Sequence, residues 1–381
     1  MPAPAAVVRP LRALADTLRA DRFFLLLLAG LCVLGVLAPN PVRSYPGLVD
    51  WSTIAALTGL LLLTKGLELS GAMHVAGQRL IDLMGTERGA ALWLVVAAAA
   101  LSTVLTNDVA LFVVVPLTLG VCRVTGMRAT RLIVFEALAV NAGSALTPIG
   151  NPQNLFIWQF SKVSFGQFVL QMAPLVAISM LLLLAVTACA FSKRPIAADA
   201  AHEAVTLDRR LLAVSLGLYL PFLVAADLHY ERWAVLLVLL TFATLRPRVL
   251  ARLDWGLLMV FVLMFVDLRL LAGLDLVRAG MQAFGLAQAS HLYLASIGLS
   301  QVISNVPAAI ALAEYSHDWR VMAYGVNVGG FGFMVGSLAN LIALRMSGDS
   351  KAWISFHQFS LPFLVAAAAL GYALLFYAGM A

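Results

Sequence analysis

The chain has 381 residues, of which 62% are hydrophobic and 12% charged, and its formal net charge is +6. Soluble proteins keep about 25% charged residues because their surface faces water, so this composition excludes a soluble globular domain and indicates the lipid bilayer as a partner. The basic excess does not indicate nucleic acid, because lysine and arginine gather in the loops between apolar segments, as the positive-inside rule describes.

The N-terminal residues 1–22 are expected to form a cytoplasmic segment, because four arginines precede the apolar run 23–38. This pattern also resembles a secretory signal peptide. The run is longer than a usual signal core, and the repeat described below requires it as a helix. We therefore prefer a retained anchor.

Apolar segments follow one another along the rest of the chain, and most approach the roughly 20 residues that a membrane span needs. They lie near 23–38, 51–69, 90–121, 132–160, 166–191, 211–226, 233–245, 255–272, 290–313, 321–346 and 356–379. Polar tips at 106–108 and 304–307 divide 90–121 and 290–313 into arms too short to cross comfortably. We interpret these two segments as re-entrant hairpins, because irregular backbone at membrane depth is tolerated only inside protein or beside a water-filled cavity.

The segments 132–160 and 321–346 contain residues that interrupt a helix. The interrupting residues are Gly143, Pro148, Gly150 and Pro152 in the first segment and Gly329, Gly330, Gly332 and Gly336 in the second. Interior prolines and glycines disfavour a continuous helix, so both segments are predicted to be broken helices. The alternative is a glycine face used for helix packing.

Loop charges predict a cytoplasmic N-terminus and an extracytoplasmic C-terminus in the inner membrane. The loop that contains Arg123, Arg128 and Arg131 falls on the cytoplasmic side only if 90–121 is a hairpin instead of a full span. The chain is thus expected to begin and end on opposite sides of the bilayer.

Several stretches recur in the same order along the chain. Residues 101–110 and 299–308 share five of their ten residues, and Asn141-Ala142-Gly143 recurs as Asn327-Val328-Gly329. We therefore predict an all-α polytopic membrane protein with two inverted-topology repeats, each holding a re-entrant hairpin and a broken helix. Repeat 1 spans 23–191 and repeat 2 spans 231–379; between them, 192–230 supplies a cytoplasmic linker and the helix 211–226, an extra crossing that inverts repeat 2.

This arrangement predicts a polar site at mid-bilayer, where hairpin tips meet broken helices. The expected substrate-binding residues are Thr106, Asn107, Ser144, Thr147, Asn151, Asn154, Ser304, Asn305, Ser337 and Asn340. The expected ion-coupling residues are Ser102, Asn107, Asp108, Gly143, Gly150, Ser300, Asn305, Asn327, Gly329 and Gly336, with a sodium ion at the hairpin tips or a proton on Asp108. Half-helix N-termini favour anions and C-termini favour cations. The alternatives are simple turn residues for the tip asparagines and a structural helix cap for Asp108.

Other polar groups are expected to be structural. No CxxC, HExxH, Walker A or GxSxG motif occurs, so no cofactor is predicted beyond a coupling ion. Glu136 is placed near the inner interface. Lys65 and Arg269, with Glu68 and Asp267 nearby, are interpreted as snorkelling charges at span ends, and Glu314, Arg345 and His357 as interfacial residues.

These stretches resemble the ion transporter superfamily, which joins citrate-transporter-like proteins, divalent-anion/sodium symporters, sodium/proton antiporters and the membrane subunit of the arsenite pump. The resemblance covers nearly all the chain from about residue 50, and four motifs carry it: STVLTNDVALFVVVP (102–116), NAGSALTPIGNPQN (141–154), SQVISNVPA (300–308) and NVGGFGFMVGSLAN (327–340). It implies hairpin tips at a central substrate site, often with sodium or proton coupling. The symporters usually carry Ser-Asn-Thr at both tips, whereas the tips here look more like those of the arsenite-pump and antiporter branches.

We therefore predict a secondary active transporter of a small anion or oxyanion, either like a di- or tricarboxylate or inorganic, coupled to sodium or protons by alternating access. A sodium/proton antiporter or an arsenite efflux permease is the alternative. An intramembrane enzyme is disfavoured because Asp108 and Asp267 lack the usual GxGD context, and a passive channel would not need two broken repeats. The sequence leaves open the substrate, the coupling ion, the direction of transport, a homodimer and the use of an ATPase partner.

Overall fold

The computed structural model describes residues 22–37, 42–72, 75, 85–196 and 206–378. Within these ranges the chain is helical, and its β-pairing is limited to an isolated bridge between Thr86 and Pro195. The helices are α2 (Arg22–Leu37), η1 (Val42–Leu48), α3 (Trp51–Leu69), α5 (Glu87–Val104), α6 (Asn107–Thr125), α7 (Ala129–Ser144), α8 (Pro152–Ser161), α9 (Phe165–Ala190), α10 (Arg209–Asp227), α11 (Glu231–Leu245), α12 (Pro247–Ala251), α13 (Trp255–Gly273), α14 (Asp275–Ala283), α15 (Ala289–Ile303), α16 (Asn305–Ala313), α17 (Trp319–Gly329), η2 (Met334–Gly336), α18 (Leu338–Met346) and α19 (Ala352–Phe376). The predicted N-terminal segment 1–22 lies, apart from Arg22, outside the described residues.

Among the described residues, six helices are long and apolar enough to cross a membrane: α3, α5, α9, α10, α13 and α19. The prediction of an all-α polytopic membrane protein is confirmed. Its division into two inverted repeats stays a prediction. The directions in which the helices run, described below, bear on this prediction. Because α5 is one of the six, length alone does not distinguish a full span from a hairpin arm.

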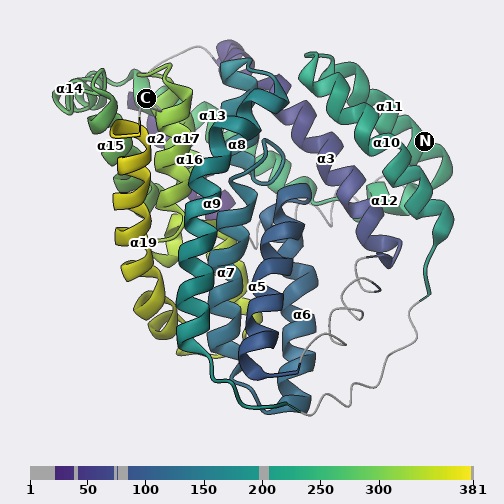
Figure 1. Cartoon of the computed structure of the whole chain (residues 1–381). Coiled ribbons are helices and arrows are strands. Elements are labelled where there is room, and N and C mark those ends of the chain that lie inside the picture. The colour runs from purple at the N-terminus through teal and green to yellow at the C-terminus, as the bar shows by residue number, and fades with distance from the viewer. Residues whose placement is uncertain (1–21, 38–41, 73–74, 76–84, 197–205, 379–381) are drawn as a thin grey trace.

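The contacts between helices divide them into two groups. Figure 1 shows α3, α10, α11 and α12 of the first group to the right of the central helices. In the peripheral group, α3 packs against α10, α11, α12 and α13, and α2 packs against α13. In the central group, α5 packs against α7, α15 against α17, and α7 also against α18 and α19. The groups meet where α3 contacts α8 and where α13 contacts α16.

The two interrupted helices of the central group run in opposite directions. The start of α7 lies beside the end of α18, because the Thr130 hydroxyl donates to the Asp349 carboxylate at 2.9 Å. The end of α8 lies beside the start of α17, because the rings of Phe160 and His317 are 5.4 Å apart. The pair α7–α8 is therefore antiparallel to the pair α17–α18.

The helix pair α5–α6 begins and ends at one end of the central group. At its start, Glu87 N–H donates to the carbonyl of Arg194, which follows α9, at 2.9 Å. After its end comes α7, where the Arg131 guanidinium donates to the Ala190 carbonyl in the last turn of α9.

The helix pair α15–α16 comes from the opposite end. Tyr293, in the second turn of α15, donates its hydroxyl to the Ala368 carbonyl in the second half of α19. A short loop leads from Ala313 to the start of α17 at Trp319. The tips of the two pairs are therefore directed toward each other.

Candidate functional site

The first interruption, between α7 and α8, is fixed by local chemistry. Asn151 caps α8 by accepting from Asn154 N–H at 2.8 Å, and Pro152 occupies the first helical position, where its missing N–H costs nothing. The Asn154 amide donates to the carbonyls of Ser144, Ala145 and Thr147 at 3.1–3.2 Å. It thereby satisfies carbonyl groups that the end of α7 leaves without helical partners.

The second interruption, between α17 and α18, contains no proline and is held from a neighbouring helix. Gln301 of α15 donates from its amide to the Gly329 carbonyl at 2.7 Å and accepts from Phe333 N–H at 2.7 Å. The Asn340 amide donates to the Gly330 carbonyl at 2.9 Å. Side-chain amides therefore stabilise this break where prolines shape the other.

Four buried asparagines connect the two breaks. The Asn141 amide donates to the Asn340 oxygen at 2.8 Å, and the Asn327 amide donates to the Asn154 oxygen at 2.7 Å. In the predicted repeats Asn141 corresponds to Asn327 and Asn154 to Asn340. The same contact is thus made twice, as a twofold relation between two similar halves requires.

The first tip fits closely against the first break. Asn107 N–H donates to the Gly150 carbonyl at 2.8 Å, and the Thr147 hydroxyl donates to the Thr103 carbonyl at 2.6 Å. A Cβ atom on Gly150 would lie 2.3 Å from the Ser144 carbonyl oxygen, so the backbones approach to a distance that only glycine permits.

The second tip is strained and incompletely bonded. Ser304 has φ +71°, a conformation that non-glycine residues rarely adopt. Asn305 is 2% exposed, and its amide nitrogen has no hydrogen-bond partner among the described residues. A Cβ atom on Gly330 would lie 3.2 Å from this nitrogen and 3.4 Å from the Asn141 oxygen. The unsatisfied donor therefore lies at the centre, where both halves meet.

Helix ends of both polarities gather around this centre. The helices α6, α8, α16 and α18 begin at the tips and breaks, whereas α5, α7, α15 and α17 end there. In addition, α6 packs against α18 and α16 against α8, so the second arm of each pair contacts the other half. Helix N-termini favour anions and C-termini favour cations. The centre can therefore hold an anion and a cation close together.

The predicted site residues lie at these tips and breaks, with different roles. Thr106, Asn107, Ser304 and Asn305 form the tips, and Asn151 donates to both Asn327 and Ser144. Ser102 and Ser300 each donate to a carbonyl of their own helix and pack against Gly143 and Gly329. Ser337 begins α18 without a side-chain capping bond, and Gly336 lies against the Gly329 carbonyl.

Three residues of the network were missed by the sequence prediction. Asn141 is the repeat counterpart of Asn327, and this correspondence could have identified it. Gln153 lies 3.5 Å from the Asn327 oxygen, and its own buried oxygen has no partner within the described chain. Gln301 occupies the position of Thr103, and no sequence signal marked it.

Charged groups around the first tip are few. The carboxylate oxygen Oδ1 of Asp108 is buried and unpartnered within the described ranges. No cluster of three or more His, Cys, Asp or Glu residues that could hold a metal ion occurs in the part of the chain that the structure describes. Asp108 is therefore the charged side chain to consider for ion coupling.

The structure shows the surroundings of two other charged groups that were interpreted as structural. Glu136 is 0% exposed and accepts a hydrogen bond from Thr118, because its face of α7 packs against α6, and its position near the inner interface stays a prediction. Asp267, two residues before Arg269, lies against Gly30 of α2, and neither of its oxygens has a partner among the residues described.

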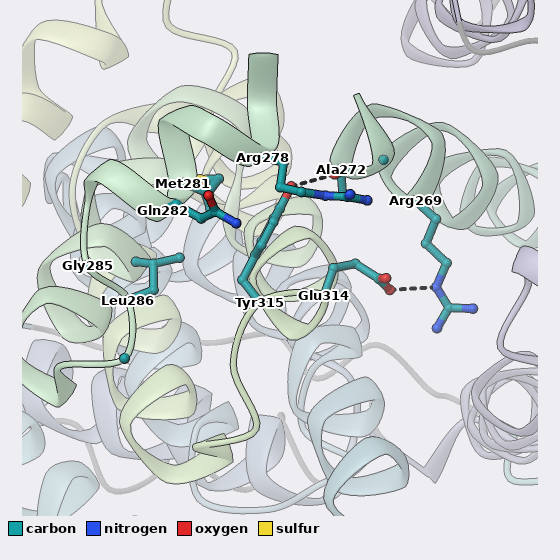
Figure 2. Close-up of a pocket in the computed structure, with 11 residues that line it drawn as sticks. Arg269, Ala272, Arg278, Met281, Gln282, Gly285, Leu286, Glu314 and Tyr315 are labelled. Atoms are coloured by element: carbon teal, nitrogen blue, oxygen red, sulfur yellow. Dashed lines mark hydrogen bonds and ion pairs between the residues drawn. The ribbon is translucent and has the colours of Figure 1, made fainter. Parts of the chain in front are cut away.

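Arg269 pairs with Glu314 at 2.9 Å, at one edge of a cleft of about 530 Å³. Figure 2 shows this pair beside Tyr315, whose hydroxyl donates to the Ala272 carbonyl at 2.7 Å. Glu314 follows the end of α16 and Asn305 begins it, so this cleft and the central site lie at opposite ends of that helix.

A multi-pass helical protein with a buried polar centre between interrupted helices has the architecture of a membrane transporter. The chain belongs to the citrate transporter family, whose model matches residues 15–322. The resemblance to the ion transporter superfamily is thereby confirmed, and the chain is a transporter, not an enzyme.

Individual relatives agree with this assignment. The chain is 47% identical to inner membrane protein YbiR of Escherichia coli (strain K12), with 94% of this chain and 96% of that protein covered. It is 30% identical to uncharacterized transporter MJ0456 of Methanocaldococcus jannaschii, with 87% and 92% covered. It is 26% identical to uncharacterized transporter Mb2703 of Mycobacterium bovis, with 87% and 86% covered.

Proposed function

We propose that the chain is a secondary active transporter of a small anion or oxyanion, coupled to sodium ions or protons, and that it works by alternating access. The main observation behind this proposal is a pair of equivalent hydrogen bonds between the two breaks. One joins Asn141 to Asn340, and the other joins Asn327 to Asn154. Two antiparallel halves joined by equivalent contacts can exchange conformations, and this exchange opens the centre to each side in turn.

The chemistry of the centre supports an anionic substrate. Four helices begin there, and the amide nitrogen of Asn305 is a buried donor without a partner among the described residues. An unsatisfied buried donor is unfavourable, and a carboxylate or inorganic oxyanion would supply the missing acceptor. The amides and hydroxyls of the network carry no formal charge. They would bind an anion weakly enough to release it, as transport requires.

Asp108 supports coupling to a cation. A carboxylate inside a membrane protein is costly unless it is protonated, paired or bound to a cation. The ends of α5 and α7 supply nearby carbonyl oxygens, which suit sodium. Proton binding to Asp108 and sodium binding beside it are both compatible with this geometry.

The predicted topology is supported by the arrangement of the central group. Both ends of α5–α6 lie beside the end of α9, where Arg131 and Arg194 gather. We infer that this end faces the cytoplasm of a cell bounded by an inner membrane, that α5–α6 and α15–α16 are re-entrant, and that the C-terminus is extracytoplasmic. An alkaline phosphatase fusion at the C-terminus should be active and a fluorescent-protein fusion dark; the reverse pattern would contradict the re-entrant hairpins.

A sodium/proton antiporter or an arsenite efflux permease is the second candidate. The observation that favours it is Asp108, since a titratable carboxylate beside free carbonyl oxygens is sufficient for cation exchange. In that case the donor of Asn305 would have no role in transport.

Transport assays in proteoliposomes separate the two candidates. The purified protein is tested with citrate, succinate, sulfate and arsenite, with a sodium gradient, a pH gradient or neither. We expect gradient-driven accumulation of citrate, succinate or sulfate and its loss in Asn305→Ala, whereas Gln358→Ala, which removes an exposed amide on α19, should transport normally. Sodium/proton exchange or arsenite transport without movement of citrate, succinate or sulfate, undiminished in Asn305→Ala, would contradict the proposal and favour the second candidate.

A further inference from the structure

A second polar cleft, separate from the centre, opens at the junction of the two helix groups. Its volume is about 620 Å³, and it lies where the end of α8 meets the start of α3 and the turn between α10 and α11. Side chains of both charges line it, namely Asp50, Glu231, Lys162 and Arg232, together with His229 and Gln159. None of these residues belongs to the proposed transport site.

Two buried polar groups in this cleft lack partners. Glu231 is 2% exposed and Gln159 is 7% exposed. The Glu231 oxygen Oε2 and the Gln159 nitrogen Nε2 are both buried without a hydrogen-bond partner among the described residues. Each unsatisfied group destabilises the empty cleft. A fitting ligand would therefore offer a positively charged donor to Glu231 and an acceptor to Gln159.

The cleft continues into an apolar groove between α10 and α11. Tyr230 and Trp233 line both the cleft and the groove, which has a volume of about 240 Å³. The other residues of the groove are Leu218, Pro221, Phe222, Ala225, Ala234, Leu237 and Val238. Tyr230 and Trp233 are 60% and 73% exposed at the ends of apolar helices, where aromatic residues mark the boundary between lipid tails and headgroups.

We propose that the cleft and the groove together bind one phospholipid of the ethanolamine class. Its primary ammonium donates to Glu231, its phosphate accepts from Gln159 and lies toward the cations Lys162 and Arg232, and an acyl chain fills the groove beside Trp233. A choline headgroup has no N–H to donate to Glu231, and a glycerol headgroup brings no positive charge to it. Because the cleft is formed by α8 together with α3 and α11, the bound lipid contacts both helix groups.

Native mass spectrometry of the full chain in detergent tests this site. The protein is mixed with equal amounts of phosphatidylethanolamine, phosphatidylcholine and phosphatidylglycerol that carry identical acyl chains. We expect the ethanolamine lipid to be retained about tenfold more than the other two, because a hydrogen bond to a charged group distinguishes it. If the wild-type protein retains the three lipids equally, or prefers phosphatidylglycerol, the proposal is overturned.

Substitutions then assign the headgroup to Glu231 and the chain to the groove. Glu231→Gln should reduce retention of the ethanolamine lipid to that of the choline lipid, whereas the control Asp275→Asn, which neutralises an exposed carboxylate on α14, should leave the preference intact. Trp233→Ala should weaken retention of all three lipids without changing their order. A full ethanolamine preference in folded Glu231→Gln protein would overturn the assignment.

Discussion

The two halves of the central site make equivalent contacts with different chemistry. In the first half, prolines and a capped helix shape the break, and the tip residue Asn107 is followed by Asp108. In the second half, Gln301 of the neighbouring helix α15 stabilises the break by a hydrogen bond to Gly329. The tip there combines the strained Ser304 with the amide nitrogen of Asn305, which has no partner among the described residues. Equivalent contacts therefore do not imply equivalent roles.

This difference indicates which tip binds the substrate and which binds the coupling ion. A strained, unsatisfied tip has free hydrogen-bonding capacity for a ligand, and strain of this kind is characteristic of ligand-binding segments. A tip that carries a buried carboxylate has capacity for a cation. We therefore expect the second tip to bind the substrate and the first to bind the coupling ion.

The largest expected effect follows from filling the close approach in the first half. A Cβ atom on Gly150 would lie 2.3 Å from the Ser144 oxygen and 2.7 Å from the Ser102 oxygen, both in the backbone, whereas a Cβ atom on Gly336 would meet one backbone oxygen at 2.7 Å. We expect Gly150→Ala to lower the free energy of unfolding by about 3 kcal/mol and Gly336→Ala by about 1 kcal/mol. Thermal unfolding in detergent measures both.

A glycine in open space controls for the added methyl group. Gly217 of α10 has no atom within 4 Å of its Cβ position, so Gly217→Ala should be neutral or stabilising by up to ~1 kcal/mol. Equal destabilisation by Gly150→Ala and Gly217→Ala would show that the close approach is not what holds the first half.

The second expected effect concerns the two tip asparagines. Asn305→Ala removes a donor that has no partner among the described residues and an oxygen that accepts a long bond from the Ser304 hydroxyl at 3.4 Å, so stability should change by less than about 0.5 kcal/mol while transport is lost. Asn107→Ala removes the side-chain oxygen that accepts from Asp108 N–H at 3.0 Å and should cost about 1 kcal/mol in addition to lost transport. Unfolding and uptake, measured on the same preparations, test the distinction; unimpaired uptake in both variants would exclude the tips from the site.

Much of this site was predictable, because its signals are local or repeated. A helix break is indicated by Pro148, Pro152, Gly143 and Gly150 from the sequence alone. The recurrence of Asn-x-Gly allows the two halves to be aligned with each other. Gln301 was not predictable, because its role depends on α17 packing against α15. The surroundings of Asp267 likewise depend on α2, which is distant in sequence.

A third difference should appear between the asparagines that follow the breaks. Asn154 bonds three carbonyls and accepts from Asn327, whereas Asn340 bonds one carbonyl and accepts from Asn141. We expect Asn154→Ala to cost about 3 kcal/mol and Asn340→Ala about 1.5 kcal/mol. Double-mutant cycles with Asn327→Ala and Asn141→Ala should give similar coupling energies for the two pairs. Coupling in one pair alone would show that the second contact is incidental.

The smallest effect on substrate exchange is expected at Asp108. The second half has no carboxylate at the matching position, Val306. Asp108→Asn keeps the shape of the side chain and removes its capacity to bind a proton or to pair with sodium. The substrate contacts assigned to Asn305 remain, so counterflow should stay within about threefold of wild type, a difference of less than 1 kcal/mol. Accumulation against a gradient should disappear, because it requires the coupling ion.

The matched position in the second half provides the control. Val306 stands where Asp108 stands in the repeat alignment, so Val306→Asn places an amide at the other tip without touching the carboxylate. Folded Val306→Asn protein should still accumulate substrate, and its dependence on sodium or pH should be that of wild type. Uptake driven by each gradient, measured beside counterflow in the same proteoliposomes, distinguishes the two variants. If Asp108→Asn accumulates substrate as well as wild type does, Asp108 caps α6 and the coupling ion binds elsewhere.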